Sequence, residues 1–245
     1  MIEVSVSSDN TVEWGDMANL KELRDERLRK LDEIKKLGIN AYPADSNRTN
    51  RVNEITSDFE GFENKAVTVA GRIVGIRKFG KLAFIVLKDG SGEMQLFLQK
   101  DVVQKTDASL GIMGIEHINL LDVGDFIEAS GNVIKSKTDE ISVAVTTMRL
   151  LTKSLRPMPD KQQGFTDKEQ RLRRRYVDLN VNEEVRQRFI RRSKFWQATR
   201  QFLLDEGFIE INVPVLEHTT GGADANPSVT HMDALDQDFY LRISH

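Results

Sequence analysis

The sequence contains no cysteine in its 245 residues, which excludes disulfide bonds, cysteine-ligated zinc and thiol catalysis. No apolar run approaches the roughly 20 residues needed to cross a bilayer. The first ten residues, MIEVSVSSDN, lack the basic start and apolar core of a signal peptide. The four histidines have no metal-binding spacing such as H-x-x-x-H, and there is no Walker-type phosphate loop and no G-x-S-x-G motif. We therefore expect no metal site, no membrane segment and a cytoplasmic location.

An excess of charge of either sign is also lacking. The chain has 35 Lys and Arg against 38 Asp and Glu, a net charge of −3, which argues against a basic coat for bulk nucleic-acid binding. The exception is residues 171–200, where nine Arg and one Lys stand against Asp178, Glu183 and Glu184. This run is either the solvated face of a helix or a surface that meets phosphates, and the residues alone leave both interpretations open.

The length of 245 residues suits one large domain or two ordinary ones, and 39% hydrophobic residues suffice for a buried core. Residues 1–65 are expected to hold one helix and a connector. Apolar residues recur mostly at three-residue steps from about Asp16 to Leu37, which is typical of an amphipathic helix, and Gly38 is a natural end for it. The polar stretch after this helix is predicted to be a connector.

Residues 66–151 change to a period of two, which is typical of strands. Three strand-like runs come first, and two more follow a break at residues 99–121 that could hold a short helix. Three glycines inside the runs permit the bends and bulges of a strongly curved sheet: Gly71, Gly75 and Gly131. Five strands with an insertion after the third predict an OB-type β-barrel, although SH3-like barrels and sandwich fragments have similar patterns.

Residues 152–175 are expected to be a linker, since they are polar and hold two of the five prolines. The second domain, residues 176–245, starts with a helix that Gly207 ends and that carries one apolar face: Val185, Phe189, Trp196 and Leu203. Short strands are expected at 208–211 and at 239–243. The sequence ends directly after the second of these, with no turn, cap or polar tail, which predicts a truncated chain.

A nucleic-acid-binding barrel needs aromatic side chains for stacking and polar groups that read base edges. Phe84 alternates with apolar neighbours in a strand, so it is either a core residue or an outward stacking residue. Gln95, between apolar residues, needs a partner that a ligand or water could supply. Glu140 could accept from a base and Arg77 could contact a phosphate, but ordinary solvent exposure explains both equally well. The residues alone reach a barrel and an α/β fragment, with no assembled catalytic site.

Three stretches, in order, carry a family resemblance: RLRRRYVDL at 171–179, QFLLDEGFIEINVPVL at 201–216 and GGADANPSVTHMDALDQDFYLRI at 221–243. They resemble class II lysyl-tRNA synthetases, and the third stretch is the most specific to lysine. Upstream, AGRIVGIRKFGKLAFIVLKD resembles the start of that family's anticodon-binding OB domain. The resemblance covers about residues 20–245, and the aspartyl and asparaginyl enzymes are the nearest rivals.

This resemblance assigns roles to the barrel residues. It implies that Phe84 stacks on an anticodon base. It also implies that Gln95 and Glu140 read the central uridine of the anticodon, with Arg77 in support. The barrel is thereby expected to bind tRNA(Lys).

In the second domain, Gly222 matches a glycine whose backbone lines the lysine pocket of the family. The stretch 201–216 is similar to class II motif 1, which builds a homodimer interface, and three of its residues mark the match: Gly207, Phe208 and Pro214. One departure is Asn226, where the family usually has an arginine, and this puts local loop contacts in doubt.

The resemblance implies an α+β multidomain fold: a five-stranded OB barrel followed by the beginning of a class II antiparallel α/β catalytic domain. It implies lysine–tRNA ligase activity, with ATP, Mg²⁺, L-lysine and tRNA(Lys). Motifs 2 and 3, which bind ATP and magnesium in the family, are absent from the sequence, so these 245 residues alone are expected to be inactive. The alternative is a non-catalytic tRNA-binding fragment or paralogue.

Overall fold

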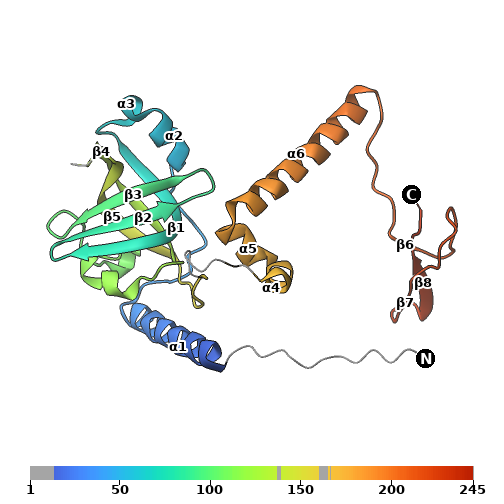
Figure 1. Ribbon diagram of the computed structural model, residues 1–245, viewed down its shortest axis with the longest axis horizontal. Coiled ribbons are helices and arrows are strands. Elements are labelled where there is room, and N and C mark those ends of the chain that lie inside the picture. The colour runs from blue at the N-terminus through green and yellow to red at the C-terminus, as the bar shows by residue number, and fades with distance from the viewer. Residues whose placement is uncertain (1–13, 137–138, 160–164, 166, 245) are drawn as a thin grey trace. The chain divides into compact units, whose positions relative to one another are not determined.

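The computed structural model describes residues 14–136, 139–159, 165 and 167–244. The chain divides into two compact units, Met1–Thr166 and Asp167–His245 (Figure 1). Within the described part of the chain, no helix is both long and apolar enough to cross a membrane.

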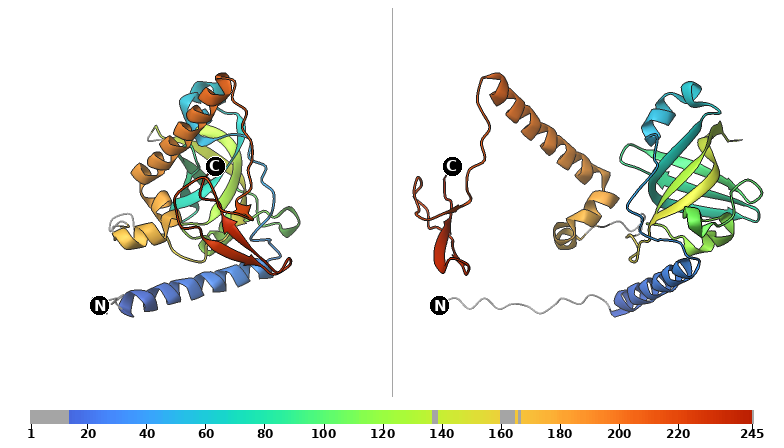
Figure 2. Two further views of the ribbon diagram at one scale, coloured as in Figure 1. Left: turned by 90° about the vertical axis from the view of Figure 1, so that its right-hand side faces the viewer. Right: turned by 180° about the vertical axis from the view of Figure 1, so that it is seen from behind.

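The first unit starts with helix α1, Trp14–Lys36, which confirms the helix expected there. Gly38 follows it with a φ of 78°, the left-handed conformation that commonly ends helices. Leu31 and Ile34 are buried in the barrel core, whereas Leu20, near the start of the helix, is exposed. Only the C-terminal half of α1 therefore packs on the barrel, and α1 lies across one end of it in both Figure 1 and Figure 2.

The connector after α1 contains two helices that the sequence pattern did not predict, α2 (Val52–Ser57) and α3 (Phe59–Phe62). Val52 and Ile55 are buried in the same core as the barrel strands. The carboxylate of Asp89 accepts a hydrogen bond of 3.0 Å from the N–H of Val52 and so satisfies the first turn of α2. These contacts with the barrel, rather than helix propensity, hold the short helix in place.

Five strands form the predicted closed barrel (Figure 2). Their order around it is β1-β2-β3-β5-β4. Their bounds are Ala66–Phe79 (β1), Leu82–Lys88 (β2), Glu93–Gln99 (β3), Phe126–Lys135 (β4) and Ile141–Thr152 (β5). Neighbouring strands are antiparallel except β3 and β5, which pair in parallel. The break expected between β3 and β4 holds two short 3₁₀ helices, η1 (Ala108–Leu110) and η2 (Ile115–Leu120).

The barrel interior follows the period of two. Ile85, Leu87 and Leu96 have no exposed surface, while the residues between them face outward. Gly131 is required where β4 meets β5, because a Cβ on it would lie 2.0 Å from the carbonyl oxygen of Ala144. The register of the two strands shifts at this glycine, as expected for a bulge in a strongly curved sheet.

A buried polar cluster joins α1 to the end of β5. Lys153 is buried and its Nζ lies 2.8 Å from Oδ2 of Asp125, and it also contacts Asp122. Lys30 of α1 reaches Asp122 at 2.6 Å. Burial favours a higher pKa for Asp122, but hydrogen bonds from Lys153 and Lys30 outweigh it and lower the pKa below its ordinary value.

Arg27 of α1 reinforces this junction. Its guanidinium donates to the carbonyl oxygens of Ser154 and Val123 at 3.0 Å each, and to that of Arg156 at 3.2 Å. The helix is therefore held by backbone groups just before β4 and just after β5, as well as by ion pairs.

The second unit has three helices and a small antiparallel sheet among its described residues. The helices are α4 (Lys168–Arg173), α5 (Arg175–Val181) and α6 (Glu183–Asp205). The strands are β6 (Leu216–Glu217), β7 (Val229–Met232) and β8 (Gln237–Leu241), in the order β6-β8-β7. Gly207 follows α6 with a φ of 84°, which confirms the predicted end of that helix.

One strand prediction is wrong. β8 corresponds to the strand expected at 239–243, but residues 208–211 form no strand. Ile209 is 85% exposed and Ile211 is 72% exposed, and no described strand lies beside them to pair with their backbone. A β-like sequence pattern forms a strand only when a neighbour supplies the hydrogen bonds.

Part of the basic run at 171–200 has a structural role. Asp178 is buried and accepts from Arg171 Nε at 3.0 Å, from Arg175 Nη1 at 2.9 Å and from Asn182 Nδ2 at 2.6 Å. Burial favours a higher pKa for Asp178, but these hydrogen bonds and charges outweigh it and lower the pKa. Arg171 thus fastens α4 to α5, Arg175 bonds within α5, and Asn182 ties Asp178 to the start of α6.

The apolar face predicted for α6 is formed but largely uncovered. Val185 is buried, whereas Trp196 is 56% exposed. A shallow groove of about 300 Å³ lies between α6 and the segment after it, lined by Trp196, Leu203, Phe208 and Ile209 among others. An exposed apolar surface of this kind is typical of a protein interface.

Candidate nucleic-acid interface

The outer face of β1, β2 and β3 carries an aromatic row. Phe84 in β2 lies directly across from Arg77 in β1 and from Phe97 in β3. Its strand neighbours Ala83 and Ile85 point into the barrel, so Phe84 points outward and is half-buried. An outward aromatic side chain meets the geometric requirement for base stacking. The stacking role of Phe84 stays a prediction.

Two further phenylalanines extend the row. The ring centroid of Phe84 is 5.3 Å from that of Phe97 and 6.0 Å from that of Phe79. Sequence reasoning singled out neither, although Phe97 lies two residues beyond Gln95 in the same strand and therefore shares its face. The period of two that exposed Phe84 could have found Phe97.

Gln95 faces outward but only 5% of it is accessible, and a side chain of the barrel supplies the partner that the sequence analysis expected from a ligand or water. Its Nε2 donates a hydrogen bond of 3.2 Å to Oγ of Ser142, the residue beside it in the parallel β3–β5 pair. That hydroxyl in turn donates to the carbonyl oxygen of Glu140 at 3.1 Å. A chain of hydrogen bonds thus connects two residues that the sequence analysis proposed for one base.

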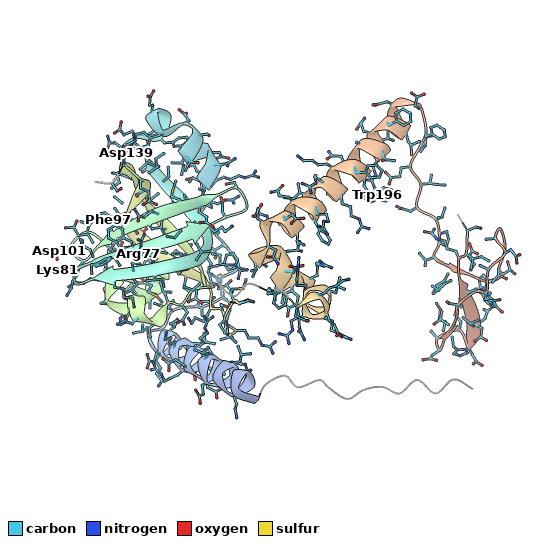
Figure 3. All side chains as sticks on the ribbon, viewed as in Figure 1. Arg77, Lys81, Phe97, Asp101, Asp139 and Trp196 are labelled. Carbon is cyan, nitrogen blue, oxygen red and sulfur yellow. The ribbon has the colours of Figure 1, made fainter. Side chains whose placement is uncertain are left out.

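Glu140 is exposed at the entrance to β5. Its N–H donates to Oγ of Ser136 at 3.1 Å, and Asp139 before it has a φ of 64°. Residues 137 and 138, just before Asp139, lie outside the described residues. Figure 3 places Asp139 at this end of the barrel.

Basic side chains accompany the aromatic row. Arg77 and Lys81 are both exposed, and neither has an ion-pair partner among the described residues. Figure 3 shows both on the β1–β2–β3 side of the barrel, together with Phe97. Uncompensated cations beside aromatic rings suit a single-stranded polynucleotide, whose phosphates and bases need these two groups.

The second unit places its predicted residues in loops. Gly222 lies between β6 and β7 with a φ of 85°, and a Cβ on it would lie 2.0 Å from Oγ of Ser244. That hydroxyl donates to the carbonyl oxygen of Gly221 at 3.1 Å. Asn226, where the sequence departs from the expected pattern, is exposed in the same loop.

The residues of the predicted dimer motif lie at and after the end of α6. Phe208 is 64% exposed, directly after Gly207. Pro214 is exposed, and its carbonyl oxygen accepts from Arg242 Nη1 at 3.4 Å. Among the described residues, no group of three or more histidine or acidic side chains could hold a metal ion.

Comparison with protein families divides the chain as the structure does. The family of OB-fold nucleic acid binding domains matches residues 67–151, and the family of tRNA synthetases class II (D, K and N) matches residues 167–245. The closed mixed barrel followed by helices and an antiparallel sheet fits that pair of domains. The chain therefore has the architecture of a class II aminoacyl-tRNA synthetase with an anticodon-binding domain ahead of its catalytic domain.

Individual relatives identify the type of synthetase. The chain is 42% identical to a lysine–tRNA ligase of Thermoanaerobacter pseudethanolicus, over 98% of this chain and 47% of the relative. Lysine–tRNA ligases of Fervidobacterium nodosum and a Nostoc species are 41% and 40% identical, over 92% and 91% of this chain and 44% and 41% of theirs. The chain belongs to the lysine–tRNA ligase family, and it spans about half the length of the curated relatives it matches.

Proposed function

We propose that the whole protein is a lysine–tRNA ligase, which joins L-lysine to tRNA(Lys) with release of AMP and pyrophosphate from ATP. In this reaction the lysine carboxylate displaces pyrophosphate at the α-phosphate, and the terminal ribose hydroxyl of the tRNA then displaces AMP. The family membership and the tandem domains support the proposal. As a participant in protein synthesis, the protein would act in the cytoplasm.

Within that protein, we assign the barrel to anticodon recognition. The carrying observation is the outward row of Arg77, Phe84 and Phe97 beside the hydrogen-bonded pair of Gln95 and Ser142. Phe84 would stack on an anticodon base. The Gln95 amide and the Glu140 carboxylate would hydrogen-bond the edge of the central uridine, and Arg77 would support it.

We assign substrate binding and dimerisation to the second unit. The backbone at Gly222 would line the lysine pocket, and a side chain at this position would collide with the hydroxyl of Ser244. The uncovered apolar face of α6, with Gly207, Phe208 and Pro214 after it, would form a homodimer interface. The family implies ATP and Mg²⁺, but the described residues form no site for the metal, so we derive no catalytic step from them.

The second candidate is a non-catalytic tRNA-binding protein. It stays a candidate because the chain matches less than half of the length of each of these relatives. The genomic reading frame decides between the two, because a ligase needs motifs 2 and 3 beyond His245. A third candidate, an aspartyl or asparaginyl enzyme, fits the class II match, which spans all three amino acids. The relatives cited above are lysine–tRNA ligases and favour lysine.

The barrel assignment is tested by binding of anticodon stem-loops to this chain. A lysine-type stem-loop should bind more tightly than one with its central uridine replaced, because base-edge contacts are each worth about 1–3 kcal/mol. Phe84→Ala should cost about 1–3 kcal/mol of binding free energy through lost stacking. Phe126→Ala is the matched control, because Phe126 lies on β4 under the guanidinium of Arg72, and it should leave affinity unchanged. Equal affinity for both stem-loops would remove the assignment.

A further inference from the structure

Phe79, at the end of β1, is a large apolar side chain that the barrel leaves exposed. Its side chain is 61% exposed, and Gly80 follows it with a φ of 59° in the turn to β2. Its described ring contact is with Phe84, at 6.0 Å between centroids. Exposure of so much aromatic surface is unfavourable in water, so a ligand that covers it would gain affinity.

The two rings cannot serve one base. The planes of Phe79 and Phe84 make an angle of 74°, so a flat base that stacks on one ring meets the other edge-on. Consecutive stacked bases are about 3.4 Å apart along a strand. The 6.0 Å between the ring centroids instead suits two neighbouring bases that have been separated from each other, as in RNA loops bound by proteins.

The charges around Phe79 suit the backbone between two such bases. Arg77 lies two residues before it on the same face of β1, and Lys81 follows in the turn. Both cations are exposed and unpaired among the described residues. Lys78 points elsewhere, since its Nζ contacts Oδ1 of Asn119.

We propose that Phe79 is a second stacking surface, which holds a base adjacent in the RNA to the base on Phe84. The site thereby takes two consecutive nucleotides, with Arg77 and Lys81 near the phosphate that joins them. This inference rests on the proposed anticodon-binding function, because it needs the same RNA loop in place on Phe84.

The test measures affinity of the 245-residue chain for four lysine-type stem-loops by fluorescence anisotropy. One loop is intact, and the others have an abasic site at the central uridine, at its 5′ neighbour or at its 3′ neighbour. Phe79→Leu keeps an apolar cover over Phe84 but removes the aromatic face, and should weaken binding of the intact loop roughly fivefold or more. Leu110→Ala, which removes an apolar side chain that is 58% exposed in η1, is the control and should bind like the wild type.

The abasic loops identify the base. The loss of affinity caused by Phe79→Leu should vanish with one of the two loops that are abasic beside the central uridine. It should persist with the other of these two and with the loop that is abasic at the central uridine. A Phe79→Leu variant that binds the intact loop normally, or a loss that is equal for all four loops, would overturn the inference. If Phe84→Ala and replacement of the central uridine still weaken binding in that case, the proposed function stands and only the second surface is lost. If neither weakens binding, the proposed function fails and this inference fails with it.

Discussion

The side-chain amide of Gln95 donates to the hydroxyl of Ser142 across the parallel pair that closes the barrel, at 3.2 Å. The amide is therefore fixed by a residue that is itself fully buried. A fixed amide presents its remaining hydrogen-bonding atoms in one direction, which is what recognition of a base edge requires. The relationship makes Ser142 a positioning residue for the proposed site.

Removal of the Ser142 hydroxyl should therefore reduce discrimination between the intact stem-loop and the loop with its central uridine replaced more than it reduces affinity for the intact stem-loop. We expect Ser142→Ala to cost about 1 kcal/mol of the difference in binding free energy between the intact stem-loop and the loop with its central uridine replaced. Thr146→Ala is the matched control, because its hydroxyl lies on the same strand but donates to the carbonyl oxygen of Ser130. Unchanged discrimination in Ser142→Ala would show that Gln95 does not need this partner.

The buried ionic cluster at the end of β5 makes the free energy of unfolding of the barrel depend on pH. The pKa of Asp122 is lowered in the folded protein, so its contribution is present above its unfolded pKa and is lost as pH falls through the folded value. Asp122→Asn should lower the free energy of unfolding by about 1–3 kcal/mol at pH 7. The difference from wild type should stay constant down to about pH 5 and shrink below about pH 4.

Urea unfolding at several pH values measures this difference. Asp32→Asn is the control, since Asp32 is exposed and its ion pair with Lys35 spans 3.6 Å on the surface of α1. It should change stability little at any pH. A difference for Asp122→Asn that is the same at pH 3 as at pH 7 would contradict the role of its charge.

The sequence predicted the barrel because its strands carry their own pattern. In β2, the alternation places Ala83 and Ile85 on one face and Phe84 on the other whatever the neighbouring strands are. Because Ala83, Phe84 and Ile85 are all apolar, the pattern left open whether Phe84 points into the barrel or away from it. The aromatic neighbours that lie across the sheet from it required the register of the strands.

Features that depend on distant partners were missed for the same reason. The two short helices of the connector need Asp89 and the barrel core, and the burial of Gln95 needs Ser142, which lies 47 residues further along the chain. The segment 208–211 failed in the opposite way, since its residues favour a strand but no described strand pairs with it. A local sequence pattern indicates which structure a segment favours, and tertiary contacts determine which structure it adopts.

The end of the chain should exchange its amide hydrogens faster than the barrel. Among the described residues from 207 onward, Phe239 is the one buried hydrophobic residue, whereas every barrel strand contributes several to one core. Few buried contacts allow frequent local opening. Hydrogen exchange followed by mass spectrometry should show peptides from 207–244 exchanging well before peptides from β2 and β3. Equal protection would mean that the small sheet is more stable than its burial indicates.

A polypeptide of these 245 residues alone should not catalyse lysine-dependent ATP–pyrophosphate exchange. The family's ATP-binding motifs 2 and 3 are not in this sequence, and stabilisation of charge on the transferring phosphate depends on such groups. The assay uses saturating magnesium and protein freed of host synthetase, with a full-length relative as the positive control. Exchange above background would show that the residues needed for adenylation have been misidentified.

The hydrogen bonds from Arg27 to the segment after β5 have a consequence for folding during synthesis. Its acceptors on Ser154 and Arg156 lie 127 and 129 residues further along the chain. A ribosome must therefore synthesise the whole barrel before α1 can reach these acceptors. During that interval Leu31 and Ile34 lack some of their native neighbours, so chaperones or non-native contacts can cover them. Helix α1 would therefore leave the ribosome before the barrel strands and dock only after them.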